Sequence, residues 1–316
     1  MSSLVTTKDV TGFTFRSYTN QMKDQEEAEL LLGLLHEYGP HYASQFGPDM
    51  RIRLLGDGSG NSADCGRGGI VGRHALCVDP YSESLRAEVV SHACIIYDDL
   101  RGDTTSAFGL FGAVITTERY RRRGLSSRLT QDVLADWDDS HPLGYLILGT
   151  GSPFAARVYQ QNGFVHLAGG FENGKKGYNP EDLGEWIMIR PPPRLGSFEK
   201  SAFVSEFYNL ESENENDFFV EPLCGRHWAE LCLLFNLDES DSEKLPSANI
   251  TDGLSVEEKV LSLVNTWSTN CINAPRVYCD NKNRRVHGII LSNKEYYVVP
   301  NSTSAVLSAL LSARFD

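Results

Sequence analysis

The sequence predicts an α/β fold in which antiparallel strand hairpins lead into helices, and three observations carry this prediction. Three β-rich segments, 73–78, 87–97 and 107–117, follow one another at the spacing of hairpins. A helix is expected from about 125 to 138, because its apolar residues recur on one face. The almost wholly apolar GYLILG at 144–149 is typical of a strand buried on both faces.

The elements on either side complete this unit. An opening strand is expected at 10–18 and a helix at 25–38, which Gly39-Pro40 ends. The glycine-rich stretch at 56–69 lacks the apolar strand and helix that flank a dinucleotide-binding fingerprint, so it is interpreted as a surface loop.

A second short helix is bracketed by its own end signals. Ser152 is its expected N-cap, Pro153 takes the first helical position and Gly163 ends it. Strands near 165–171 and 186–190 then finish the unit.

A chain of 316 residues favours two domains, and the Pro191–Pro193 run is a reasonable boundary. We expect a catalytic domain at 1–195 and an acidic domain at 196–316. The order of elements in the second part suggests a partial, possibly degenerate copy of the first. Its expected strands are 218–220, near 277, 286–291 and 296–299, and its expected helices are 228–235, 256–267 and a last one from about 304.

Composition excludes several classes of function. A net charge of −13 argues against binding nucleic acid or anionic membranes. The seven cysteines include no C-x-x-C pair, so we expect reduced thiols and no metal site. Neither a secretory signal nor a membrane span is indicated, and we expect a cytoplasmic protein.

The stretch RRRGLSS, residues 121–127, lies between a strand and an amphipathic helix. This arrangement makes an anion-binding site from the free backbone N–H groups at the helix start, the helix dipole and small residues that let the ligand approach. Pyrophosphate is the ligand that we expect there. The alternative interpretation is a solvated basic surface.

A second motif follows in SPFAARVYQQNGF, where Ala155, Tyr159, Gly163 and Phe164 have the spacing A-x-x-x-Y-x-x-x-G-F. Together with the R-x-x-G-x-small turn, this order of elements over residues 10–190 resembles the GNAT superfamily of acyl-CoA-dependent N-acyltransferases. Two departures exist: Ser126 stands where the family usually has Gly or Ala, and Ser152 where many members have Asn.

The resemblance implies a mixed, mostly antiparallel twisted sheet flanked by helices, with a GNAT-like C-terminal domain that is possibly degenerate. It also implies that acetyl-CoA lies in a V between the strands at 110–117 and 144–149. The pantetheine arm would pair with the first of these strands and the pyrophosphate would sit on the turn. The implied cofactor-binding residues are Val114, Ile115, Thr116, Arg121, Arg122, Arg123, Gly124, Leu125, Ser126 and Ser152.

The same resemblance gives Tyr159 the position of the general acid that protonates the departing thiolate. A base is harder to find, because an amine of pKa about 10.4 must lose a proton before it attacks. His92 lies in an apolar strand run, and we weigh two interpretations, a satisfied core histidine and a catalytic base.

The predicted function is transfer of an acetyl group from acetyl-CoA to a primary amine, of a small molecule or a protein, by direct attack in a ternary complex. Two alternatives stay open. The chain could be a degenerate CoA-binding sensor or scaffold, or the fold could carry a C-terminal module that recruits a basic partner.

Overall fold

The structure is a computed structural model, and it describes most of the first 208 residues and less of the rest. The described residues are 4–8, 12–19, 25–38, 70–80, 88–98, 107–169, 186–208, 218–223, 227–237, 275–281, 284–290 and 296–298. Two sheets, of eight and four strands, contain the strands of this part of the chain.

The large sheet has the strand order β1-β2-β3-β4-β5-β6-β8-β7. Its strands are β1 (Leu4–Lys8), β2 (Thr14–Thr19), β3 (Ile70–Asp79), β4 (Glu88–Asp98), β5 (Phe108–Thr116), β6 (Tyr145–Thr150), β7 (Val165–Gly169) and β8 (Trp186–Arg190). Neighbours run antiparallel except β5 and β6, which are parallel. The predicted mixed, mostly antiparallel sheet flanked by helices is therefore confirmed.

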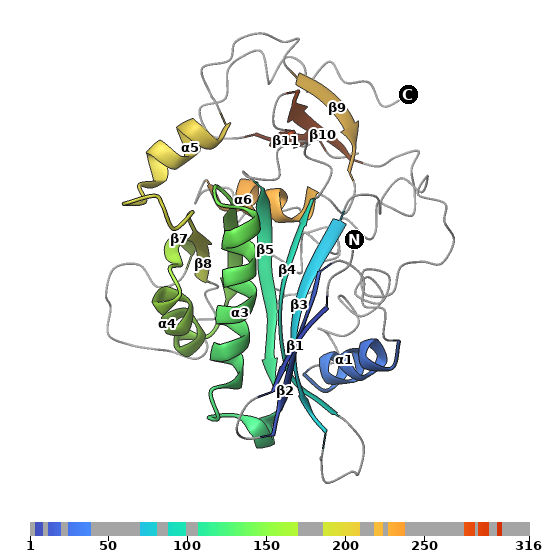
Figure 1. Ribbon diagram of the computed structural model, residues 1–316. Helices are drawn as coiled ribbons and strands as arrows, with labels where there is room; N and C mark the ends of the chain where they lie inside the picture. Colours follow the sequence, from blue (N-terminus) through green and yellow to red (C-terminus); the bar gives the residue numbers. More distant parts are fainter. Residues whose placement is uncertain are drawn as a thin grey trace.

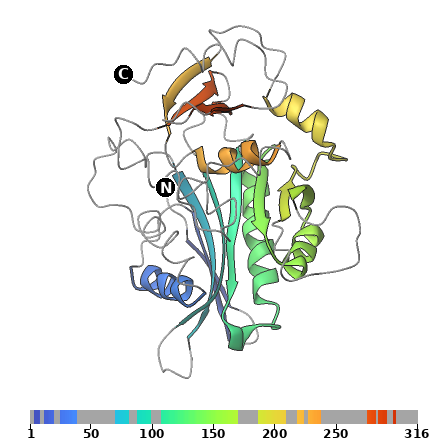
Figure 2. The ribbon, with the colours of Figure 1, turned by 180° about the vertical axis from the view of Figure 1, so that it is seen from behind.

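Helices cover both faces of this sheet (Figures 1 and 2). The helices α3 (Leu125–Ser140) and α4 (Pro153–Gln161) pack on one face, and α1 (Gln25–Tyr38) and α6 (Trp228–Leu237) on the other. Successive residues of β5 point to opposite faces. Accordingly, Phe111 lies in the core beneath α3 and α4, whereas Phe108 and Leu110 lie in the core beneath α6.

The expected single strand at 10–18 is wrong in its extent. Only β2 falls in this range, and an additional strand, β1, precedes it; the two pair antiparallel with Leu4 opposite Tyr18. Gly12 lies just before β2 with a φ of 89°, a conformation that residues with a side chain adopt only with strain. Strand geometry therefore begins only at Thr14.

The second sheet has the order β12-β11-β10-β9 and is antiparallel throughout. Its strands are β9 (Phe218–Pro222), β10 (Arg276–Asp280), β11 (Val286–Ile290) and β12 (Tyr296–Val298), and α5 (Lys200–Tyr208) precedes them. The sequence did not predict α5. The expected helices at 256–267 and from 304, and the expected loop at 56–69, lie outside the described residues.

The helix α6 contacts both sheets. It packs against β5, β6 and β7 of the large sheet and against β11 and β12 of the small one. Glu230 in α6 is buried and accepts hydrogen bonds from the Val286 amide, at 2.7 Å, and from the Arg285 guanidinium, at 3.0 Å. One apolar core therefore runs across both sheets.

The described helices include none long and apolar enough to cross a membrane.

Candidate functional site

The site is built around a fork in the large sheet. β5 and β6 pair only at Phe108–Leu110 with Tyr145–Ile147. Beyond Leu110 the edge of β5 that faces β6 has no strand partner within the described chain, while its other edge stays paired with β4 up to Thr116. This is the V that the resemblance implies. Backbone groups along such an edge can pair with an extended ligand.

A β-bulge interrupts β5 inside the fork. His92 faces Ile115 and Cys94 faces Gly112, so two residues of β5 oppose one of β4. Ala113, in the bulge, has a φ of 49°, which is unusual for a residue with a side chain. The bulge directly precedes Val114, Ile115 and Thr116, the residues expected to contact the pantetheine arm.

The turn after β5 leaves a set of backbone amides without acceptors. Arg122 and Gly124 both have left-handed backbones, with φ values of 62° and 78°. The first amide of α3 with a backbone acceptor is that of Arg128, which donates to the Gly124 carbonyl at 3.0 Å. Within the described part of the chain, the amides of residues 122–127 have no hydrogen-bond acceptor. Alternating backbone conformations of this kind form a nest for an anion.

Arg121, Arg122 and Arg123 are exposed and form no ion pair with a carboxylate within the described part of the chain, whereas Arg119 and Arg128 on either side pair with Glu88 and Asp132. Arg121 donates to the Thr116 carbonyl at 3.2 Å, which turns it back toward the end of β5. The Arg123 guanidinium lies 5.1 Å from the centroid of the Tyr120 ring. Burial raises the pKa of Tyr120 to about 12, and its hydroxyl donates to Asp79 at 2.8 Å. This neutral ring therefore anchors the base of the turn.

The second expected motif forms a capped helix on the other arm of the fork. The Ser152 hydroxyl accepts a hydrogen bond from the Ala155 amide at 3.3 Å, and Gly163 ends the turn after α4 with a φ of 88°. Both end signals that the sequence predicted are confirmed.

Tyr159 lies at the vertex of the fork. It projects from α4, is 9% exposed, and its ring packs edge-on against Phe111 with centroids 5.7 Å apart. Phe111 is the first residue of β5 beyond the pairing with β6. The ring therefore sits where the two strands separate, and its role as general acid stays a prediction.

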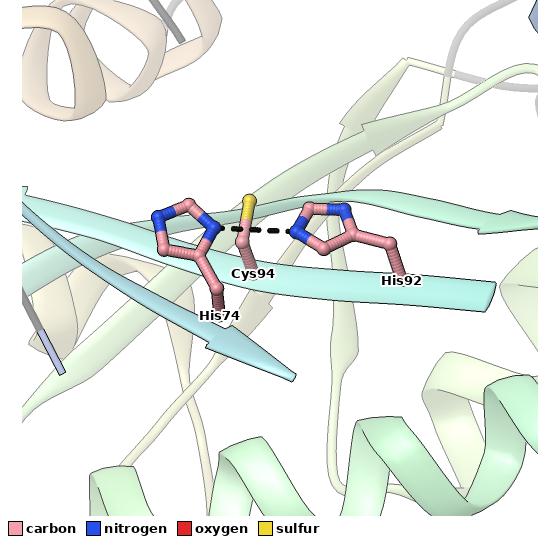
Figure 3. A group of neighbouring side chains, drawn as sticks. All are labelled: His74, His92 and Cys94. Carbon is pink, nitrogen blue, oxygen red and sulfur yellow. Dashed lines mark hydrogen bonds between the residues drawn. The ribbon is translucent and has the colours of Figure 1, made fainter. Parts of the chain in front are cut away.

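His92 lies on the opposite face of the sheet from Tyr159 and is fully buried. Its Nδ1 donates to the Ala113 carbonyl at 2.9 Å, and its Nε2 accepts from the Nδ1 of His74 at 3.2 Å (Figure 3). Burial lowers the pKa of His92 to about 4, which keeps the ring neutral at neutral pH. The ring is thus a hydrogen-bonded core histidine in this arrangement, and its role as a base stays a prediction.

Ser91 is a site residue that the sequence reasoning missed. It is fully buried, and its hydroxyl donates to the Ile115 carbonyl at 2.8 Å and accepts from the Thr116 hydroxyl at 2.7 Å. These bonds hold the end of β5 against β4. No local pattern marks Ser91, because its partners are set by strand register.

The comparisons with known proteins come from structures alone. No protein-family model matches the chain, and no curated protein matches it. The similar solved structures include an acetyltransferase of the GNAT family from Staphylococcus aureus Mu50, which is 14% identical. That match covers 57% of this chain and 99% of the other, with a TM-score of 0.35.

Two further similar structures are known with bound ligands. The structure of the NatC complex bound to Gag peptide and CoA contains a chain that is 13% identical, with 60% of this chain and 98% of that one covered and a TM-score of 0.35. Arabidopsis thaliana NAA60 in complex with a bisubstrate analogue is 13% identical, with 55% and 98% covered and a TM-score of 0.36. At 13–14% identity and TM-scores of 0.35–0.36, these three matches are a likeness in overall fold and carry no conclusion about activity or ligand.

Proposed function

We propose that this protein is an acyl-CoA-dependent N-acyltransferase that moves an acetyl group from acetyl-CoA to a primary amine. The observation that carries the proposal is the nest at residues 122–127. Six amides without acceptors lie beside three arginines that no described carboxylate neutralises, directly after the open edge of β5. A pyrophosphate linked to an extended amide chain, as in coenzyme A, matches both features.

In this proposal the turn after β5 and the edge of β5 bind different parts of acetyl-CoA. The amides of 122–127 and Arg121 bind the pyrophosphate, and the edge of β5 at Val114–Thr116 holds the pantetheine amides. The thioester then lies near the vertex of the fork, beside Tyr159. This placement uses each expected cofactor-binding residue of the turn and strand.

The reaction forms a C–N bond and breaks a C–S bond. The neutral amine attacks the thioester carbonyl carbon, and the sulfur leaves with the electron pair of the C–S bond. The Tyr159 hydroxyl donates a proton to that thiolate, and the tyrosinate regains one from the solvent. The new ammonium loses a proton to water or to a neutral imidazole, for which His92 is the candidate. The acceptor is a small molecule or a protein that carries a primary amine.

The nest is tested by changing the charge of one side chain at Gly124. A Cβ built there meets no heavy atom within 4 Å, so a longer side chain fits without a clash. Gly124→Glu and Gly124→Lys share the same backbone strain and similar bulk, and they differ in the sign of the charge. We expect Gly124→Glu to weaken acetyl-CoA binding at least about 100-fold, and Gly124→Lys far less.

Calorimetry with acetyl-CoA measures these affinities, and thermal melting checks that each variant is folded. Arg122→Ala serves as a milder change, because one exposed, screened charge should alter affinity by less than about fivefold. Equal affinities for the glutamate and lysine variants would show that no anion binds at this turn, and the proposal would fail.

A second candidate function is a CoA-binding sensor without chemistry. The observation that favours it is His92, because both of its ring nitrogens already take part in hydrogen bonds. Thiol release from acetyl-CoA across a panel of primary amines separates the two functions. An amine-dependent release identifies an enzyme, and tight binding without release for every amine identifies a sensor.

A further inference from the structure

A buried group of potential metal ligands lies on the face of the sheet behind the bulge. His74 on β3 pairs directly with Cys94 on β4, so their side chains share one face. His92 is two residues before Cys94 and points to the same face. Figure 3 shows the two rings and the thiol gathered together. None of the three is more than 1% exposed, and their ligand atoms all lie within 4.8 Å of one another.

We propose that His74, His92 and Cys94 form a binding site for a transition metal ion, Zn²⁺ in the first place. The site includes no residue of the nest and no group of Tyr159, but it shares His92 with the acyltransfer proposal, and a His92 whose Nε2 binds a metal ion could not also take up the proton of the amine.

The two imidazoles already stand at the spacing that a metal requires. The Nδ1 of His74 and the Nε2 of His92 are 3.2 Å apart. In a tetrahedral site with metal–nitrogen bonds of about 2.0 Å, two nitrogen ligands lie roughly 3.3 Å apart. An ion bound by both nitrogens would lie to one side of the line that joins them, so each ring must turn toward it, but the two nitrogens need not move apart. The thiol of Cys94 completes the set by rotating about its Cα–Cβ bond.

The bulge supplies the outer contact that a metal-binding histidine usually has. The Nδ1 of His92 donates to the Ala113 carbonyl, so the lone pair of the neutral ring lies on Nε2, toward the group. The carbonyl thereby fixes both the tautomer and the orientation of the ring. A backbone carbonyl is among the commonest such partners of zinc-bound histidines.

Binding of the metal ion requires one proton to leave Cys94 and another to move within His74. The Cys94 thiol, which donates to the Gly112 carbonyl at 3.4 Å, releases its proton to the solvent and binds as a thiolate. The Nδ1 proton of His74 moves to the other ring nitrogen, so that both lone pairs are available. Two imidazoles and one thiolate suit Zn²⁺ and Co²⁺. Gly112 faces the same side, and a Cβ built there meets nothing within 4 Å, which leaves room for water as a fourth ligand.

A second group, Glu221, His227 and Cys279, has ligand atoms equally close together. Its carboxylate is already shared, because Glu221 contacts His227 at 3.0 Å and the Arg284 guanidinium at 3.4 Å. A cation placed there would be repelled by the arginine. The first group has a backbone carbonyl, that of Ala113, behind one of its histidines, so it is the better site.

The test uses full-length protein produced in cobalt-supplemented medium, since a buried site fills most easily during folding. Co²⁺ bound to a thiolate gives a sulfur-to-cobalt charge-transfer band in the near ultraviolet, and elemental analysis gives the metal content. We expect about one Co²⁺ per chain with this band. Cys94→Ser should abolish the band and lower the retained cobalt at least about tenfold. His74→Gln should lower the cobalt content similarly.

The matched control is Cys77→Ser. Cys77 lies on β3, is fully buried, and packs in the core on the opposite face of the sheet. The Cys77→Ser protein should keep both the charge-transfer band and the bound cobalt. Wild-type protein without the band overturns the proposal whether or not any variant folds. So does a band that survives in Cys94→Ser, or one that disappears in Cys279→Ser instead.

Discussion

Arg190 on β8 joins the two helices that carry the candidate site, and its removal should destabilise the protein measurably. Its guanidinium is largely buried and contacts both oxygens of Asp138 in α3, at 2.6 and 2.7 Å. Its Nε also donates at 2.9 Å to the carbonyl of Asn162, at the end of α4. Arg190→Met keeps an unbranched apolar stem out to the position of Nε and removes all three hydrogen bonds.

The size of the effect follows from burial. Removing one partner of a buried ion pair costs about 3–5 kcal/mol, because the other charge stays behind. The Asp138 side chain is 26% exposed, so water compensates part of this loss, and we expect a decrease of about 2–3 kcal/mol in the free energy of unfolding. The same helix offers a control. Arg128 contacts both oxygens of Asp132 at 2.9 and 3.0 Å, but that pair is exposed, and Arg128→Met should cost about 0.3–0.5 kcal/mol.

Urea unfolding of each arginine variant, each aspartate-to-asparagine variant and each double variant gives the coupling energy of both pairs. The buried pair should show a coupling several times larger than the exposed pair. Equal coupling energies would refute the reasoning, because the larger effect is attributed to the burial of the arginine, whose side chain is 11% exposed at Arg190 and 48% exposed at Arg128.

Two further predictions concern Tyr159 and His141. Tyr159→Phe should lower turnover by about 10²- to 10⁴-fold with little change in acetyl-CoA affinity, and turnover within about twofold of wild type in a steady-state assay would contradict the general-acid role. Burial, with Arg73 nearby, lowers the pKa of His141 to about 4. As the pH falls from about 6.5 to 4, the His141 imidazole binds a proton in the unfolded state but not in the folded state. The free energy of unfolding should therefore drop by up to about 1.4 kcal/mol per pH unit. His92 has a similarly lowered pKa and adds a slope of its own, so His141→Asn should reduce the slope in urea unfolding at several pH values without abolishing it, and an unchanged slope would show that His141 does not contribute.

Local signals explain what could be predicted from sequence. The helix from Leu125 and the capped helix after Ser152 were expected because the apolar periodicity and the end residues that define them lie close together in the sequence. The candidate anion-binding turn was visible for the same reason, since Gly124 and the arginines are contiguous.

Features that depend on strand register could not be predicted in this way. His74 and Cys94 are neighbours only because β3 and β4 pair with one particular register. A search for C-x-x-C spacing therefore could not bring them together. Ser91 and the bulge at Ala113 have the same origin. The late start of the opening strand, after Gly12, is a smaller error, because an isolated glycine within a strand pattern does not reveal its φ.

The helix α6 has a consequence for how the protein is made. Translation delivers the chain from its N-terminus, so all eight strands of the large sheet leave the ribosome before residues 228–237 do. Until then, the apolar side chains of Phe108 and Ile147 lack the helix that covers their face in the finished protein. A nascent chain at this stage exposes an apolar surface of the kind that chaperones bind. In chains stalled on the ribosome before α6 emerges, the large sheet should therefore be sensitive to protease. Once α6 has been synthesised and packs on the sheet, this sensitivity should disappear.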